Sequence, residues 1–331
     1  MRVFAFEFFS GGGLLHQPLE SSVVREGDLM LRTLAGELGR IGGVHVVVSR
    51  DSRLPPVEGC ETLWPVQGEN LDGLFARGVM AADAVWPTAP EGGGTLERLA
   101  AEVETAGRIL LGPRPAAVRI AASKRETARL LEHSGVRVVP TWGAGERLPA
   151  LPGAWVVKPD DGAGCDGLEL LADHAEAARQ LEASGGILVA QPWVEGEPWS
   201  LSLLCAGGRA HLLSCNRQRL RRENGGLSLE SILVNARPLA DPRVTRLGDE
   251  VASAIPGLRG YVGVDFLLTS DGPAVLEVNP RLTTSYCGLP AALDRNIAGL
   301  VLDLHGTGCL PDPVPWSARQ VEIALRPEHA A

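Results

Sequence analysis

Three oxygen-bearing side chains are expected on one face of a late β-hairpin. Two apolar runs, residues 261–268 and 274–279, flank an Asp-Gly turn and predict a pair of antiparallel strands. Side chains alternate between the faces of a strand, so Glu277 and Asn279 share a face and Asp265 lies across from them. Buried carboxylates are costly without a cation or a hydrogen-bonding partner. Because Mg²⁺ is typically held by one or two carboxylates together with substrate phosphates, the hairpin predicts a magnesium site at these three residues.

Arg281 follows this hairpin and is the candidate catalytic residue beside the metal. A fixed guanidinium can stabilise charge that develops on a transferring phosphoryl group or on a tetrahedral adduct. The alternative is structural, with Asp265 and Glu277 capping loops at the strand ends or pairing with Arg281. No Ser-His-Asp or Cys-His nucleophile pattern is visible, so covalent catalysis is not expected.

Phosphate contacts are expected at the two lysines of the chain, Lys124 and Lys158, which stand among 31 basic residues. A compact ammonium can act where a planar guanidinium cannot, and Lys158 is also a candidate catalytic residue. It ends a predicted strand that leads into a glycine-rich loop, residues 160–167, whose backbone N–H groups could converge on an anion. The alternative is a hairpin with an Asp-Gly turn, and the P-loop spacing is absent. The candidate loop contacts are Gly162, Ala163, Gly164, Asp166 and Gly167.

A proline-aromatic bend follows the next predicted strand, residues 187–190, and offers a side-chain amide, backbone groups and apolar surface. An adenine ring needs such a slot with a few polar edge contacts. The alternative is an ordinary buried strand end. The candidate contacts are Gln191, Pro192, Trp193, Val194 and Glu195.

The elements that must position these residues change in character along the chain. Up to about residue 115, predicted strands alternate with helices, which indicates an α/β domain with a doubly wound parallel sheet. Helices are expected over residues 95–105, capped by Thr95, and over residues 116–134. From residue 155 to residue 270, short apolar runs separated by turn signals predict an antiparallel α+β region. Residues 326–331 are expected to be a frayed tail.

Composition excludes several classes of protein. The formal net charge of −9 argues against a nucleic-acid-binding surface. No apolar run approaches the roughly 20 residues that span a bilayer, and the N-terminus lacks a secretory apolar region. The six cysteines show no C-x-x-C pair or metal spacing, which favours buried thiols in a reducing compartment. A cytoplasmic protein with no membrane or nucleic-acid partner is the expectation.

The order and spacing of these motifs resemble the ATP-grasp carboxylate-amine ligases over about residues 1–305. The resemblance implies an ATP-grasp fold with an N-terminal parallel-sheet (pre-ATP-grasp) domain at residues 1–115, a lid subdomain at 116–190 and a C-terminal subdomain with the metal site at 191–331. It also implies ATP and Mg²⁺ as cofactors, with Mn²⁺ as a substitute. Relatives carry a ribose-binding glutamate where this chain reads Pro198, so Glu195 or Glu197 would take that contact.

Within this family the chain resembles the tyramine–glutamate ligases of methanofuran biosynthesis and their bacterial counterparts in one-carbon metabolism. This likeness rests on residues 4–13, 25–27 and 279–286. It implies that ATP converts the side-chain carboxylate of glutamate to an acyl phosphate, which an aromatic amine such as tyramine or tyrosine then attacks. The implied substrate contacts are Glu7, Gly11, Gly12, Arg217, Thr283, Thr284 and Ser285.

Three questions stay open on the sequence alone. The substrates could be another amino acid or peptide, or the enzyme could be a carboxylase that uses carboxyphosphate. A non-catalytic ATP-binding regulatory module is the alternative from another class, although it would not require Asp265, Glu277, Asn279 and Arg281 together. The oligomeric state is also open, with a homodimer as one option.

Overall fold

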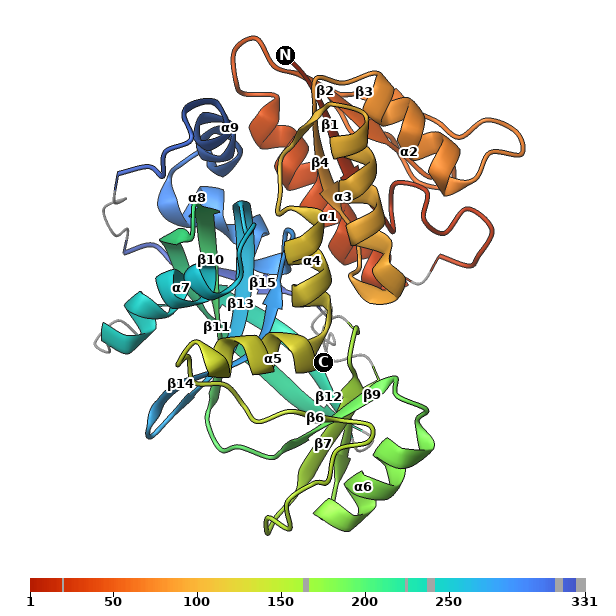
Figure 1. Ribbon diagram of the computed structural model, residues 1–331. Coiled ribbons are helices and arrows are strands. Elements are labelled where there is room, and N and C mark those ends of the chain that lie inside the picture. The colour runs from red at the N-terminus through yellow and green to blue at the C-terminus, as the bar shows by residue number, and fades with distance from the viewer. Residues whose placement is uncertain (20, 163–166, 224–225, 237–241, 313–317, 326–331) are drawn as a thin grey trace, which may run out of the picture.

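The computed structural model contains three β-sheets joined by helices (Figure 1) and describes residues 1–19, 21–162, 167–223, 226–236, 242–312 and 318–325. The predicted tail, residues 326–331, lies outside this described part. No helix in the described ranges is long and apolar enough to cross a membrane.

The N-terminal part forms a parallel sheet of order β3-β2-β1-β4-β5. Alternate side chains of its strands point to opposite faces, so α1 packs on one face and α2 and α3 on the other. This arrangement confirms the predicted doubly wound α/β architecture. The elements are β1 (Arg2–Glu7), α1 (Ser21–Leu38), β2 (His45–Ser49), β3 (Glu61–Leu63), α2 (Leu71–Met80), β4 (Ala84–Thr88), η1 (Gly92–Gly94), α3 (Thr95–Thr105) and β5 (Ile109–Leu110).

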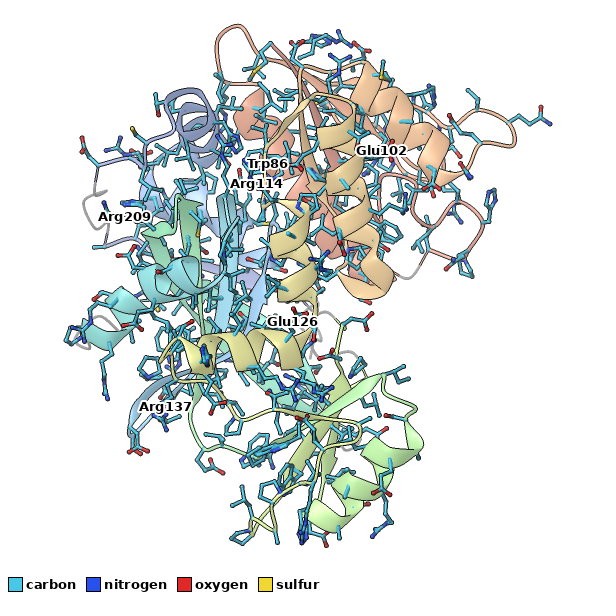
Figure 2. The ribbon with its side chains drawn as sticks, viewed as in Figure 1. Trp86, Glu102, Arg114, Glu126, Arg137 and Arg209 are labelled. Atoms are coloured by element: carbon cyan, nitrogen blue, oxygen red, sulfur yellow. The ribbon has the colours of Figure 1, made fainter. Side chains whose placement is uncertain are left out.

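Two short helices, α4 (Pro115–Ala122) and α5 (Lys124–His133), connect the parallel sheet to the rest of the molecule (Figure 1). The prediction of one helix over residues 116–134 was wrong, because Ser123 adopts an extended conformation and its side chain accepts a hydrogen bond from the backbone of Glu126. Ser123 is therefore the N-cap of α5, and Glu126 lies on the first turn of that helix (Figure 2).

The predicted cap of α3 also needs correction. The N-cap position belongs to Gly94, which has a φ of 69°. Thr95 is already helical, and its hydroxyl donates to the carbonyl of Gly92 at 3.1 Å.

A four-stranded antiparallel sheet of order β6-β9-β7-β8 forms a separate layer, with α6 packed against it. Its small core surrounds the fully buried Trp155. The elements are β6 (Trp142–Gly143), β7 (Trp155–Pro159), β8 (Glu169–Leu171), α6 (His174–Ala183) and β9 (Leu188–Pro192).

The largest sheet is antiparallel and has the order β14-β13-β10-β11-β12-β15. It contains the predicted late hairpin as β13 and β14, and α7 covers one of its faces. The edge strand β15 was not predicted. The elements are β10 (Glu197–Ala206), β11 (Arg209–Glu223), β12 (Gly226–Val234), α7 (Pro242–Ala254), β13 (Gly260–Thr269), β14 (Gly272–Asn279), η2 (Thr284–Gly288), α8 (Leu289–Leu293), α9 (Ile297–Thr307) and β15 (Val321–Ala324).

The two antiparallel sheets confirm the predicted change from an α/β domain with a parallel sheet to an antiparallel α+β region. The domain boundaries at residues 115 and 190 stay predictions; the first falls at the start of α4 and the second falls within β9.

Candidate active site

The predicted metal ligands lie together on the hairpin of β13 and β14. Asp265 is the cross-strand partner of Glu277, and Gly263 is the partner of Asn279. The Asn279 amide donates to Asp265 Oδ2 at 3.1 Å, and the Gln218 amide on β11 donates to Asp265 Oδ1 at 3.0 Å. Gln218 was not predicted. Its position on a third strand depends on sheet pairing that local sequence patterns do not specify.

The ionisation of Asp265 and that of Glu277 depend on each other. Burial and the negative charge of Glu277 raise the pKa of Asp265. Burial also acts against the charged form of Glu277, but the charges of Lys124, Lys158 and Arg281 and a hydrogen bond with Asp265 together lower the pKa of that carboxyl group. Two adjacent carboxylates in a partly buried position therefore need positive charge nearby.

The donor set suits magnesium that also binds phosphate oxygens. Among the described residues, no group of three or more His, Cys, Asp or Glu side chains could hold a metal ion by itself. The hairpin instead offers two carboxylates and the amide oxygen of Asn279, all hard oxygen ligands. Mg²⁺ prefers such incomplete sites, because waters and substrate phosphates complete its octahedron.

Lys124, at the first position of α5, reaches this hairpin. Its side chain is 4% exposed, and its Nζ lies 3.7 Å from Glu277 Oε2. The ammonium also donates to the carbonyl oxygens of Asp160 and Gly162 in the glycine-rich loop. The Asp160 carboxylate in turn accepts from the Ser123 hydroxyl at 2.7 Å and from the Arg125 backbone at 2.9 Å. The N-terminus of α5 is thus fixed to the loop.

Part of the predicted phosphate loop can be placed. Gly162 lies beside Lys124, Glu277 and Asn279 around a small second cavity. Gly167 has a φ of 66°, a conformation that side chains other than glycine rarely adopt. The predicted contacts Ala163, Gly164 and Asp166 lie outside the described residues.

A cavity of about 610 Å³ lies between the two antiparallel sheets. Lys158 and Gln191 line it from the four-stranded sheet, and Asp265 and Glu277 line it from the six-stranded sheet. Its apolar walls could enclose a planar ring, while the charged groups lie at the hairpin. The apolar lining includes Val139, Val156, Leu168, Leu220, Leu227, Leu267 and Leu276.

The predicted adenine bend contributes Gln191, Pro192, Trp193 and Val194 to this cavity. The Gln191 amide donates to the Thr141 hydroxyl at 2.8 Å, which fixes its orientation. The Arg222 guanidinium, on β11, lies 4.6 Å from the centroid of the Trp193 ring. This cation–π contact joins the two sheets beside the cavity, and no local pattern of residues predicts it.

Glu195 does not line this cavity. Its carboxylate accepts from the Trp193 indole N–H at 2.7 Å, whereas Glu197 lies in the cavity lining. Glu197 also forms an ion pair of 3.3 Å with Arg217, another lining residue. Of the two glutamates expected as alternatives near the ribose, Glu197 is the one at the cavity.

Arg281 lies beyond the hairpin and pairs with a residue of the N-terminal part. Its Nε is 3.0 Å from Glu91 Oε1, and the two side chains are 13% and 6% exposed. Glu91 follows β4 and shares the lining of the second cavity with Lys124, Glu277 and Asn279. Glu91 was not predicted, because about 190 residues separate it from Arg281 and no local pattern identifies the contact.

The predicted substrate contacts do not form one cluster. Glu7 is buried, and its carboxylate accepts hydrogen bonds from the Phe9 and Ser10 backbones and from the Ser10 hydroxyl. Burial raises the pKa of this carboxyl group despite those hydrogen bonds. Gly11 and Gly12 form the turn that follows, where Gly12 has a φ of 117°. These residues shape the end of β1.

The remaining substrate candidates occupy two other places. Thr283 and Ser285 belong to a hydroxyl network with Tyr261. The hydroxyl of Thr284 donates to Glu26 on α1 at 3.1 Å. Arg217 lies on the large cavity instead.

Comparisons with known proteins agree with this architecture. Residues 121–285 match an ATP-grasp domain, and residues 44–118 match a pre-ATP-grasp domain. A curated tyramine–L-glutamate ligase from Methanocaldococcus jannaschii is 36% identical over 99 residues, which are 30% of this chain and 30% of that relative. The alignment thus spans less than a third of the curated relative.

Two solved structures share the fold over most of this chain. An ATP-grasp superfamily protein from Archaeoglobus fulgidus has a TM-score of 0.71 at 24% identity, covering 98% of this chain and 92% of that chain. An L-amino acid ligase from Bacillus licheniformis has a TM-score of 0.65 at 18% identity, covering 92% of this chain and 74% of that chain. The solved structures show the shared fold, and because residues 44–118 and 121–285 match the pre-ATP-grasp and ATP-grasp domain models, the chain belongs to the ATP-grasp family.

Proposed function

We propose that this protein is an ATP-dependent ligase that joins a carboxylate to an amine and releases ADP and phosphate. The observation that carries the proposal is the convergence of two carboxylates and two lysines: Asp265, Glu277 and Lys158 line the apolar cavity, and Lys124 lies 3.7 Å from Glu277. The apolar cavity could enclose a purine beside charged groups that could bind polyphosphate, which supports the proposal. The partial likeness to a tyramine–L-glutamate ligase supports glutamate and an aromatic amine as the substrates.

The proposed reaction has two steps. A carboxylate oxygen of the first substrate attacks the γ-phosphorus of ATP, and ADP leaves. The neutral amine then attacks the carbonyl carbon of the acyl phosphate, and phosphate leaves with the electrons of the C–O bond. The amine proton passes to phosphate or solvent, so the products are an amide, ADP and phosphate.

The protein's part in this reaction is to bind, orient and neutralise charge. Phosphoryl transfer requires little covalent participation from an enzyme. Lys124 and Lys158 would compensate the phosphates, and Arg281 would stabilise charge on the transferring group. Asp265, Glu277 and Asn279 would hold Mg²⁺, which when bound neutralises the phosphate oxygens and orients them. Residues 191–194 would contact adenine, and Glu197 would contact the ribose.

The test is nucleotide release with matched pairs of substrates. ADP is measured with Mg²⁺ or Mn²⁺, ATP, a panel of amino acids and a panel of amines that includes tyramine, and products are identified by mass spectrometry. The proposal requires ADP release and an amide only when a carboxylate and an amine are both present. ADP release with bicarbonate alone would instead indicate a carboxylase, and tight ATP binding without turnover on any pair would indicate a regulatory module.

A further inference from the structure

The buried ion pair of Glu91 and Arg281 joins the N-terminal domain to the end of the metal-binding hairpin. Its 3.0 Å contact is almost fully shielded from water, so each charge depends on the other for compensation. Arg281 Nη1 also donates to the Leu282 carbonyl at 3.1 Å. The guanidinium is therefore held from two sides, by one residue of its own segment and one from the distant segment after β4.

The segment that carries Glu91 also touches the glycine-rich loop. The backbone N–H of Gly93 donates to Asp161 Oδ2 at 2.9 Å. A Cβ on Gly92 would approach the Asp161 carbonyl to 3.3 Å, so a larger residue would crowd this contact. Residues 91–93 thus contact both the loop that precedes Gly162 and the guanidinium that follows the hairpin.

Besides Glu91, Arg281 interacts electrostatically with Glu26 and with the two carboxylates of the hairpin, Glu277 and Asp265. A guanidinium that moved toward those carboxylates would compete with a metal for the same oxygens. It would also leave the place where charge develops during phosphoryl transfer. The Glu91 carboxylate, 3.0 Å from Arg281 Nε, opposes both movements.

We propose that Glu91 is a positioning residue that holds the Arg281 guanidinium at the phosphate end of the active site and away from the metal-binding carboxylates. The inference rests on the proposed ligase function for its kinetic readout. It assigns a role in catalysis to the pre-ATP-grasp domain through a side chain that the sequence motifs do not include. Glu91 acts through Arg281 and need not touch a substrate.

The test compares Glu91→Gln, Glu91→Asp, Arg281→Ala and the double variant Glu91→Gln/Arg281→Ala in the full chain. Because Arg281 acts on charge that develops in the transition state, Glu91→Gln should lower kcat for ADP release about 10- to 100-fold and change the ATP dissociation constant less than about 3-fold. The double variant should be within about 2-fold of Arg281→Ala, because removing Glu91 has no further effect once the guanidinium is gone. Glu97→Gln is the matched control, since it breaks another glutamate–arginine pair, between Glu97 on α3 and the exposed Arg119 on α4.

Glu91→Asp is included in case Glu91→Gln does not fold. It keeps the charge of the ion pair and moves the carboxylate by one methylene. A folded Glu91→Gln protein with kcat within about 2-fold of the wild type would overturn the proposal, as would a folded Glu91→Asp protein that loses more activity than Arg281→Ala, or losses that multiply in the double variant. If the wild type releases no ADP with any substrate pair, the proposed function fails by itself. The role of Glu91 is then decided by the NMR signal of the Arg281 side-chain N–H in the presence of Mg-ATP. It should shift in both Glu91 variants, and an unchanged signal would refute the proposal.

Discussion

Asp265 and Glu277 are direct cross-strand neighbours at the centre of the hairpin of β13 and β14. Like charges at such positions destabilise a sheet, yet hydrogen bonds from Asn279 and Gln218 hold the Asp265 carboxylate in place. Lys124 offsets part of the repulsion from 3.7 Å away. Two neighbouring carboxylates repel each other in the protein alone, and a bound divalent cation would compensate that repulsion. The Asp265–Glu277 pair therefore supports the predicted metal site.

Removing the carboxylate of Asp265 or of Glu277 should lower activity strongly and change stability little. We expect Asp265→Asn and Glu277→Gln to lower kcat at least about 100-fold, because each removes an oxygen ligand that the metal requires. The free energy of unfolding should change by less than about 2 kcal/mol, since each substitution also removes like-charge repulsion. ADP release and chemical denaturation measure the two effects. Normal turnover of Glu277→Gln would rule out the metal assignment. Glu230→Gln, which breaks the ion pair between β12 and Arg221 on β11, is the control.

Replacing the lysines by arginine should impair nucleotide binding although the charge is kept. Lys124 is enclosed by the Asp160 and Gly162 carbonyls and Glu277, and a planar guanidinium cannot fit the same contacts. Lys124→Arg and Lys158→Arg should each raise the ATP dissociation constant about 10-fold, measured by calorimetry with Mg²⁺. The reverse exchange Arg98→Lys, at an exposed side chain of α3 that pairs with Asp72, should leave binding unchanged. Equal affinities in all four proteins would contradict the phosphate roles.

The parts of the site that were predictable are those encoded by short-range patterns. Alternation in residues 261–279, with an Asp-Gly turn between the two runs, was enough to bring Asp265, Glu277 and Asn279 to one face. The break at Ser123 was also readable, because Ser123 and Glu126 have the spacing of a capping box. The prediction of a continuous helix followed its apolar periodicity and ignored that signal.

The parts that were not predictable depend on how distant segments meet. Glu91 reaches Arg281 only because the loop after β4 lies against the end of the hairpin. Gln218 reaches Asp265 through the placement of β11 two strands away from β13, with β10 between them. No periodicity or spacing in the sequence predicts either contact. Charge and residue type alone could therefore not have identified Glu91 and Gln218 as residues of the site.

His305 should make the protein less stable in mild acid. Burial, assisted by the positive charge of Arg259, lowers the pKa of this imidazole from 6.5 to about 4. Because the unfolded chain takes up the proton first, the free energy of unfolding should fall as the pH drops from about 6.5 to about 4, by on the order of 2–3 kcal/mol. No such effect is expected well above pH 6.5, where the His305 imidazole is neutral in both the folded and the unfolded protein. Urea unfolding as a function of pH measures it.

His305→Gln removes this titration, so its unfolding free energy should decline less over the same pH range than that of the wild type. His133→Gln, at the exposed end of α5, is the control and should retain the wild-type slope. Identical slopes for all three proteins would show that His305 does not contribute to the acid sensitivity.

The contact between Arg222 and Trp193 should govern nucleotide affinity more than turnover. The contact joins the bend after β9 to the long strand β11 beside the cavity, with 4.6 Å from the guanidinium to the ring centroid, and it involves none of the hairpin carboxylates. Arg222→Ala should raise the KM for ATP about 3- to 10-fold, as expected for a cation–π contact of about 1 kcal/mol, and should change kcat less than about 2-fold. Arg221→Ala is a matched control because the neighbouring arginine pairs with Glu230 and does not line the cavity. An unchanged KM for Arg222→Ala, or an equal rise in KM for both variants, would show that the contact between Arg222 and Trp193 does not contribute to ATP binding.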